Sequence, residues 1–455
     1  MDLRQFWFDG LAQASYMLVD GTDAIVVDPA LEIEQYVDAA SEHGARIRHI
    51  VETHVHADFV SGHVELSEAT GAPVWFGARV DTDFAASPLE DGAELSFGAS
   101  VLRALETPGH TPESLTLVAR GRDGRSVALT GDTLFVGDVG RPDLAAGARY
   151  SVTDMARMLY ASLTEKVMRL PDDTLVYPAH GAGSLCGKSL SGARSTTVRN
   201  ERLTNPALAA AGEDAFVRYV TSDLPPQPAY FARAARVNRS GPMRRRVFLE
   251  SMRPLTPADV AREVDAGAIV LDTRDEDVFP HGHIPAAVNV ALCDKLGAWA
   301  GTVLPADARL VLCADPGTER VAALELLRVG ADPPVGYLSG GMAAWRAAGQ
   351  PEESIPEIAP EALLAERARH TVIDVRAVSE FETDHVKGAI NVPLTELPRR
   401  LAEFTAATPY ALICASGFRS MIAASVLKRA GVRSVANVLG GMGQLLERTE
   451  RRLLA

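Results

Sequence analysis

The stretch Thr53-His54-Val55-His56-Ala57-Asp58-Phe59 places three side chains that can bind a metal within five consecutive residues. A strand-like segment, residues 47–51, comes directly before it. Side chains alternate along a strand, so His54, His56 and Asp58 are spaced to point into one cavity where the strand ends. Imidazole and carboxylate ligands together suit zinc or iron rather than calcium. The stretch therefore predicts a transition-metal site, and the alternative is a polar turn after a buried strand.

Three further loops repeat this form and weaken the polar-turn alternative. His110 lies in Glu106-Thr107-Pro108-Gly109-His110-Thr111-Pro112, Asp132 in Leu129-Thr130-Gly131-Asp132-Thr133, and His180 in Val176-Tyr177-Pro178-Ala179-His180-Gly181. The first two follow apolar runs, at residues 101–105 and 127–129, that predict strands. Together the four loops resemble the metallo-β-lactamase superfamily over roughly the first 250 residues. The resemblance implies a four-layer αββα sandwich with a metal site at one edge of its sheets.

Phe59 separates this chain from the hydrolases of that superfamily. Hydrolases such as glyoxalase II carry His-x-His-x-Asp-His and bind two metals, and here Phe59 replaces the last histidine. A phenyl ring cannot bind a metal, so we expect one metal per chain. His54, His110 and Asp132 remain, and two imidazoles with one carboxylate form the ligand set of the non-haem Fe(II) facial triad. The alternative for the metal is a mononuclear zinc hydrolase.

The pattern resembles the persulfide dioxygenase branch of the superfamily, and this resemblance implies roles for further residues. It implies that one Fe(2+) is bound at His54, His110 and Asp132, with open positions for dioxygen and substrate. It makes His56 and Asp58 groups that orient the ligands or a water, and it includes His180 in the site.

Three more residues are expected near the substrate. Arg141, in the turn-rich segment 137–144, resembles the family's substrate-facing arginine, and the alternative is a surface salt bridge. Cys186 lies between glycines, six residues past His180, where fused persulfide dioxygenases carry a cysteine that handles sulfane sulfur. The alternative is a structural thiol in a tight loop. The hydroxyl of Tyr177 is expected close to the pocket, unless Tyr177 is a core residue.

The last part of the chain contains an internal repeat with a period of about 100 residues, which means two copies of one domain. Leu271-Asp272-Thr273-Arg274 matches Ile373-Asp374-Val375-Arg376, Val311-Leu312-Cys313 matches the strand ending in Ile413-Cys414, and Ser339-Gly340-Gly341-Met342 matches Leu439-Gly440-Gly441-Met442. Strands alternate with helices, so each copy is expected to be α/β with a mainly parallel sheet. The landmarks resemble the rhodanese domain. We therefore predict three domains, at residues 1–250, 253–351 and 356–455.

The two copies differ at their cysteine loops. In the second copy, the span from Cys414 to Arg419 has the six residues typical of sulfurtransferases and leads into a helix. The backbone amides of such a loop form an anion nest that stabilises a thiolate or a persulfide, and Arg419 closes the loop. In the first copy, the span from Cys313 to Arg320 is two residues longer and contains a proline and two acids, which oppose a thiolate. We expect an active second copy and an inactive first copy.

Composition limits the class of protein. The 455 residues correspond to about three domains. The net charge of −14 argues against nucleic acid or an anionic membrane surface as a partner. Four cysteines without close pairing fit a reducing compartment. The amino-terminal residues lack a signal-peptide pattern and no apolar run approaches 18 residues, so we expect a cytoplasmic protein that does not span a membrane.

The combined pattern predicts a function. By resemblance, the chain is an iron-dependent persulfide dioxygenase fused to a sulfurtransferase. A small-molecule thiol persulfide is oxidised by O2 to sulfite, and Cys414 carries sulfane sulfur and forms thiosulfate, in sulfide detoxification. We also expect a homo-oligomer. The alternatives are a hydroxyacylglutathione hydrolase (glyoxalase II)-like thioester hydrolase, which metal count and identity would reveal, and a non-catalytic sulfur carrier, which an intact metal triad argues against.

Overall fold

The structure, a computed structural model, describes residues 1–121, 124–145, 147, 149–188, 190–224, 226–365 and 367–448. It divides into two compact units, Met1–Arg244 with Arg328–Gly330, and Arg245–Leu327 with Ala331–Ala455. The first unit thus ends slightly before the boundary predicted at residue 250, and residues 449–455 of the predicted third domain lie outside the described residues. No helix in the described part of the chain is long and apolar enough to cross a membrane.

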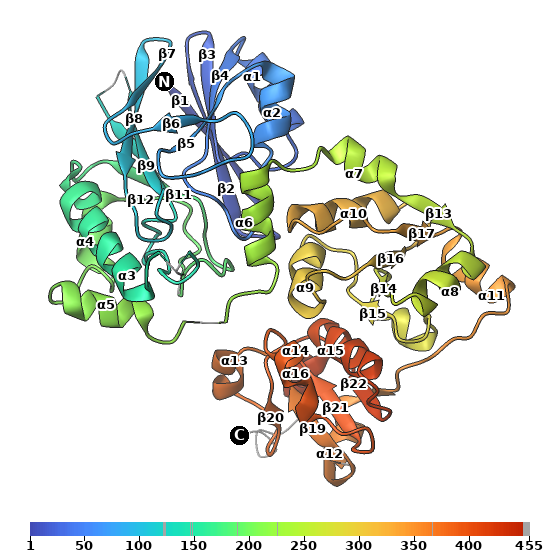
Figure 1. Cartoon of the computed structure of the whole chain (residues 1–455). Coiled ribbons are helices and arrows are strands. Elements are labelled where there is room, and N and C mark those ends of the chain that lie inside the picture. The colour runs from blue at the N-terminus through green and yellow to red at the C-terminus, as the bar shows by residue number, and fades with distance from the viewer. Residues whose placement is uncertain are drawn as a thin grey trace. The chain divides into compact units, whose positions relative to one another are not determined.

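The first unit is built on two six-stranded sheets (Figure 1). The first sheet has the order β1-β2-β3-β4-β5-β6, with β1 (Asp2–Phe8), β2 (Gln13–Asp20), β3 (Asp23–Val27), β4 (Arg46–Val51), β5 (Val74–Gly77) and β6 (Ser87–Leu89). The second has the order β12-β11-β10-β9-β8-β7, with β7 (Glu94–Phe97), β8 (Ser100–Glu106), β9 (Leu115–Arg120), β10 (Ser126–Gly131), β11 (Leu175–Pro178) and β12 (Thr196–Thr197).

Helices cover the outer face of each sheet. They are α1 (Glu34–Glu42), α2 (His63–Thr70), α3 (Val152–Ala161), α4 (Val198–Thr204), α5 (Glu213–Thr221) and α6 (Phe231–Ser240), with a short π-helix η1 (Ser162–Lys166) and a short 3-10 helix η2 (Val167–Arg169). Tyr36 and Leu66 pack α1 and α2 on the first sheet, and Leu159 and Phe216 belong to the core beside the second. Figure 1 shows α1 and α2 on the side of the first sheet that faces away from the second.

The core between the sheets follows from strand alternation. In β8, Leu102 and Ala104 are buried while Val101 and Arg103 are exposed, because alternate side chains point to opposite faces. Leu102 packs with residues of both sheets, including Leu18 and Leu117. Burying a leucine in such a core stabilises the fold by about 1.5–3 kcal/mol. The predicted αββα sandwich is therefore confirmed, and so are the strands predicted before His110 and Asp132.

The second unit contains two α/β domains of identical topology. Their sheets have the orders β13-β17-β16-β14-β15 and β18-β22-β21-β19-β20, and all strand pairs are parallel. The earlier domain has β13 (Arg253–Leu255), β14 (Ile269–Asp272), β15 (Val288–Asn289), β16 (Leu310–Cys313), β17 (Gly336–Leu338), α7 (Arg245–Ser251), α8 (Pro257–Asp265), η3 (Phe279–His281), α9 (Leu296–Val303), α10 (Glu319–Arg328) and α11 (Gly341–Ala347).

The later domain repeats this pattern. It has β18 (Glu357–Ile358), α12 (Pro360–Ala365), η4 (Arg367–Arg369), β19 (Thr371–Asp374), α13 (Val378–Thr383), β20 (Ile390–Asn391), α14 (Leu397–Arg400), η5 (Leu401–Glu403), β21 (Tyr410–Ile413), α15 (Phe418–Arg429), β22 (Val435–Val438) and α16 (Gly441–Arg448). The predicted pair of α/β domains with parallel sheets is confirmed.

Candidate metal centre and thiol sites

Three loops that follow strands bring the predicted metal ligands together. His54 follows β4, His110 follows β8 and Asp132 follows β10. The Nε2 atom of His110 lies 3.4 Å from Oδ2 of Asp132, and Nε2 of His54 lies 3.7 Å from the same oxygen. The ligand atoms lie within 4.8 Å of one another, and all three side chains are buried.

The other nitrogen of each imidazole is held by the chain. Nδ1 of His54 lies 3.0 Å from Oγ1 of Thr53, and Nδ1 of His110 lies 3.0 Å from the carbonyl oxygen of Arg141. Each ring therefore presents Nε2 to the centre. Among the described residues, Nε2 of His54 and Oδ2 of Asp132 are buried without a hydrogen-bond partner. Ligand atoms that converge in this way fit a divalent metal held by two imidazoles and one carboxylate.

The surroundings keep the ligands in the forms that bind a metal. Burial and the charge of His56 lower the pKa of His54 well below its ordinary value, and burial lowers the pKa of His110. Burial alone would raise the pKa of Asp132, but the imidazoles of His180 and His54 hold it well below its usual range. Neutral imidazoles and an ionised carboxylate are the metal-binding species, so the centre is prepared for a cation.

A glycine allows the loops after β4 and β10 to approach closely. Gly131 adopts φ +52°, in the left-handed region, and a Cβ there would lie 2.6 Å from Oγ1 of Thr53. Any other residue at this position would push Thr53 away from its contact with His54. The tight turn before Asp132 is thus a condition for the geometry of the centre.

His180 joins the metal centre to a second group of polar residues. Its Nδ1 lies 2.7 Å from Oδ1 of Asp132, and its Nε2 lies 2.7 Å from Oδ2 of Asp58. Burial would lower the pKa of His180, but the carboxylates of Asp132 and Asp58 raise it to about 10. The imidazole therefore bridges two carboxylates and fixes the orientation of a predicted metal ligand.

Cys186 lies beside this bridge. Its ligand atom is within 4.8 Å of those of Asp58 and His180, and the residue is 1% exposed. Burial and the nearby carboxylates raise the pKa of its thiol well above the ordinary value. The structure therefore brings Cys186 next to the predicted metal centre as a protonated, enclosed thiol.

Arg141 and Tyr177, which are predicted to lie near the substrate, contact other parts of the chain in the structure. The guanidinium of Arg141 is buried and donates to both carboxylate oxygens of Asp143, at 2.7 and 2.8 Å, so it holds its own loop in place, and its contact with a substrate stays a prediction. The ring of Tyr177 packs on the core between the sheets, 5.8 Å from the ring of Tyr16, because strand alternation in β11 turns it inward. In the described residues neither side chain lines the cavity beside the metal centre.

That cavity opens beside His110 and has a basic rim. It has a volume of about 330 Å3 and is lined by residues of the loops after β4, β5 and β8, by residues 144, 145, 149 and 150, and by α6. Arg79, Arg149 and Arg239 are among its lining residues. Arg79 pairs with Glu106, whereas the described residues offer no ion pair to exposed Arg149 or Arg239. Two acids also line the cavity: Glu113 accepts a hydrogen bond from the backbone nitrogen of Val55, and Asp81 is exposed. The two guanidinium groups without an ion pair outnumber the one exposed carboxylate and favour an anionic ligand.

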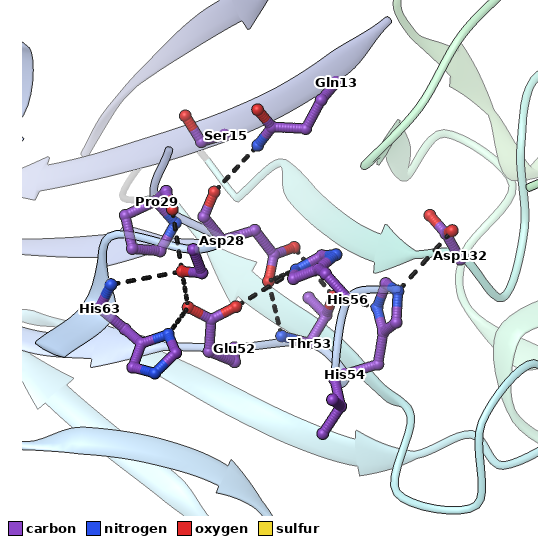
Figure 2. A network of polar contacts seen from close by, with 12 residues as sticks. Gln13, Ser15, Asp28, Pro29, Glu52, Thr53, His54, His56, His63 and Asp132 are labelled. Carbon is purple, nitrogen blue, oxygen red and sulfur yellow. Dashed lines mark hydrogen bonds and ion pairs between the residues drawn. The ribbon is translucent and has the colours of Figure 1, made fainter. Parts of the chain in front are cut away.

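A buried polar cluster behind the centre was absent from the sequence-based prediction. Asp28 accepts hydrogen bonds from the backbone nitrogen and Oγ1 of Thr53, at 2.7 and 2.8 Å. Glu52 accepts a hydrogen bond from Ser61, and its carboxylate lies 3.1 Å from Nδ1 of His63. Figure 2 shows the carboxylate of Glu52 between His63 and His56. Burial alone would raise the pKa of Glu52, but hydrogen bonds from His56 and His63 lower it to about 2. The one feature of the sequence that could have predicted this cluster is Glu52, an acid directly before Thr53 and His54.

The loop of the later α/β domain surrounds its cysteine with donors. Sγ of Cys414 lies 3.1 Å from the backbone nitrogen of Gly417 and 3.4 Å from Oγ of Ser420, and α15 begins at Phe418. Gly417 adopts φ +115°, which only glycine tolerates easily. Arg419 is bonded to Glu380 through two contacts of 2.7 Å. The loop therefore aims an amide and a hydroxyl at the sulfur, as an anion nest does.

The earlier domain has no cysteine at the corresponding position. In the paired strands Asp272 lies opposite Cys313, and Asp374 lies opposite Ile413, so Cys313 corresponds to Ile413. The sequence match of Cys313 with Cys414 is therefore wrong by one residue, and Ala314 takes the place of Cys414. Burial and the carboxylate of Asp272 raise the pKa of Cys313 well above its ordinary value.

Comparison with known proteins agrees with this architecture. Residues 8–180 match the metallo-beta-lactamase superfamily, and residues 256–348 and 359–447 each match the rhodanese-like domain. The chain belongs to the metallo-beta-lactamase superfamily and carries two rhodanese-like domains after its sandwich.

Curated relatives and a solved structure show which members of the superfamily the amino-terminal half is similar to. The chain is 32% identical over 229 residues to the mitochondrial persulfide dioxygenase ETHE1 of Homo sapiens, covering 50% of this chain and 83% of that protein. It is 30% identical over 171 residues to the cytoplasmic hydroxyacylglutathione hydrolase of Arabidopsis thaliana, covering 36% of this chain and 62% of that protein. A metallo-beta-lactamase structure from Staphylococcus aureus is 29% identical, with a TM-score of 0.66, and covers 74% of this chain and 98% of that one.

Proposed function

We propose that the protein is an iron-dependent persulfide dioxygenase with an attached sulfurtransferase. The observation that carries the proposal is the buried triad of His54, His110 and Asp132 in a domain that resembles ETHE1. When bound by such a triad, Fe(2+) supplies a redox-active cation with open positions for O2 and substrate. The overall reaction oxidises a thiol persulfide, R-SSH, with O2 and water to R-SH and sulfite.

The chain's own groups have separate roles in this reaction. His54 and His110 present neutral Nε2 atoms, because Thr53 and the carbonyl of Arg141 hold their other nitrogens. His180 holds Asp132 in place and carries a proton between two carboxylates. The enclosing loops exclude water from the buried ligands, which strengthens every charge interaction in the site. Cys186 is enclosed beside Asp58 and His180, and its thiol must lose a proton before it exchanges sulfur with a persulfide, because the thiolate is the nucleophile.

The basic rim of the cavity supports an anionic substrate. Arg149 and Arg239 are exposed at the cavity, and a guanidinium group binds carboxylates and phosphates in a planar fork. A low-molecular-weight thiol with charged groups remote from its sulfur fits this arrangement.

The later rhodanese-like domain would transfer the sulfane sulfur. A thiolate at Cys414 attacks the outer sulfur of a donor, and the S–S bond of the donor breaks as Cys414 becomes Cys-SSH. Sulfite then attacks the outer sulfur, leaving thiosulfate and the Cys414 thiolate. Gly417 and Ser420 donate toward the sulfur that carries negative charge. A homo-oligomeric state and a cytoplasmic location stay predictions.

The test is anaerobic purification with metal analysis, followed by oxygen uptake on addition of glutathione persulfide. We expect one iron per chain and sulfite as the product. Two zinc ions per chain with thioester hydrolysis and no oxygen uptake would instead identify a hydroxyacylglutathione hydrolase-like enzyme.

A further inference from the structure

His56 lies next to a metal ligand but faces away from the metal centre. It shares a loop with His54, and the two ring centroids are 4.1 Å apart. Its Nε2 atom lies 3.0 Å from Oδ1 of Asp28 and 3.2 Å from Oε2 of Glu52. In Figure 2, His54 points toward Asp132, whereas His56 points between these two carboxylates. A third imidazole beside the metal centre is thus directed toward these carboxylates instead of toward the triad.

The two carboxylates that hold His56, those of Asp28 and Glu52, differ in their other contacts. Asp28 also accepts both hydrogen bonds from Thr53, so it serves the loop as well as His56. Oε2 of Glu52 has His56 as its contact, while Oε1 is fixed by Ser61 and His63. Glu52 is 1% exposed, and the contacts of Oε1 with Ser61 and His63 turn Oε2 toward His56. The position of Glu52 therefore serves to orient the ring of His56.

We propose that Glu52, acting with Asp28, is a positioning residue that sets the number of protein ligands on the metal. By holding Nε2 of His56, it keeps the centre at two imidazoles and one carboxylate. Three protein ligands suit a cation that must keep open positions, whereas a fourth would complete the tetrahedral set that zinc prefers. Glu52 thereby selects an open iron-type centre over a closed zinc-type centre in a site that offers three histidines.

The inference rests on the proposed metal centre and not on the reaction, so its test reads the ligands of the metal directly. X-ray absorption of the iron-loaded and zinc-loaded full chain counts imidazoles. In Glu52→Ala, Asp28 is left to hold both Thr53 and His56, which weakens its hold on the His56 ring. We therefore expect two imidazoles in the wild-type protein and three in Glu52→Ala, with the affinity for zinc relative to iron raised about tenfold or more, the scale on which groups behind a metal ligand act. Absence of persulfide oxidation would defeat the proposed function without changing this count.

Matched variants separate positioning from general damage. In Glu52→Gln the amide oxygen can face His56 while the amide nitrogen faces Ser61 and His63, so two imidazoles should be retained. In Glu52→Ala/His56→Gln the released ring is absent, and the count should return to two. If Glu52→Ala does not fold, Glu52→Met fills the volume without an acceptor and should show three. An unchanged count of two and unchanged metal preference in the folded variant would overturn the proposal.

Discussion

Nδ1 of His110 lies 3.0 Å from the backbone carbonyl oxygen of Arg141. Because the guanidinium of Arg141 is fixed on Asp143, the carbonyl of the same residue is held in place for the imidazole. Arg141, which the sequence predicts to face the substrate, thus helps to hold the predicted metal ligand His110 in position. We therefore expect Arg141 and Asp143 to influence the affinity of the site for a metal.

Replacing Arg141 by Ala is expected to weaken metal binding more than substrate binding. Loss of a group that orients a ligand typically costs about 10- to 100-fold in metal affinity. The measurement is metal affinity by chelator competition, beside KM for the persulfide in fully loaded protein. Asp143→Asn should show a smaller effect in the same direction. A higher KM with unchanged metal affinity would return Arg141 to the substrate-facing role.

His110→Ala is expected to remove both the metal and oxygen uptake. Two ligands in an open site hold a divalent cation poorly, so metal per chain should fall to less than about a tenth of the wild-type content. Metal analysis of anaerobically purified protein checks this, with the thermal unfolding of the full chain followed by circular dichroism as the control for folding. Full metal content in the variant would exclude His110 as a ligand.

The fold and the triad could be predicted because they depend on local patterns. Each of His54, His110 and Asp132 follows a strand with recognisable alternation, and the loops after such strands carry the site. Glu52 and Asp28 escaped prediction because their roles depend on where the ring of His56 turns, which strand periodicity does not specify. The direction of a side chain in a loop is set by tertiary contacts.

The mismatch at Cys313 has a different cause. Matching by residue type aligned one cysteine with another. Strand pairing instead places Cys313 opposite Asp272 and Ile413 opposite Asp374, so Cys313 is equivalent to Ile413. A shift of one residue in a strand moves a side chain to the other face of the sheet. Ala314 is therefore the equivalent of Cys414, and because alanine has no sulfur, this position supports the prediction that the earlier rhodanese-like domain is inactive.

Removing the two unpaired arginines of the cavity should reduce discrimination by substrate charge. Arg149→Gln/Arg239→Gln is expected to lower kcat/KM for glutathione persulfide about tenfold, while kcat/KM for its diethyl ester stays near the wild-type value. Arg236→Gln is the control, because Arg236 is an exposed arginine of the same helix, α6, outside the cavity lining. Equal losses for acid and ester would contradict charge recognition.

Cys186→Ser should leave the metal bound but change persulfide turnover or the distribution of products. The thiol lies beside Asp58 and His180, outside the triad, so iron content is expected to stay at the wild-type level. Because burial and nearby carboxylates raise the pKa of Cys186, iodoacetamide should modify it slowly at neutral pH. Mass spectrometry and quantification of sulfite and thiosulfate provide the measurements. Unchanged kinetics and products would make Cys186 a structural thiol.

Cys414→Ser is expected to abolish sulfur transfer between thiosulfate and an acceptor, with oxygen uptake largely retained. The sulfur of Cys414 receives contacts from Gly417 and Ser420, and the metal triad belongs to a different unit of the chain. Cys313→Ser should change neither activity, because this thiol ends a buried strand and lies beside Asp272.

The comparison requires a sulfurtransferase assay run beside an oxygen electrode on both variants. Ser420→Ala provides a graded test, since it removes one of the two contacts to the sulfur and should lower transfer about tenfold without abolishing it. Loss of transfer in the Cys313 variant, with transfer retained in the Cys414 variant, would reverse the assignment. That result would show that Cys313 reacts although it lies opposite Asp272 in the sheet. Burial and the carboxylate of Asp272 both raise the pKa of this thiol and so oppose its reaction.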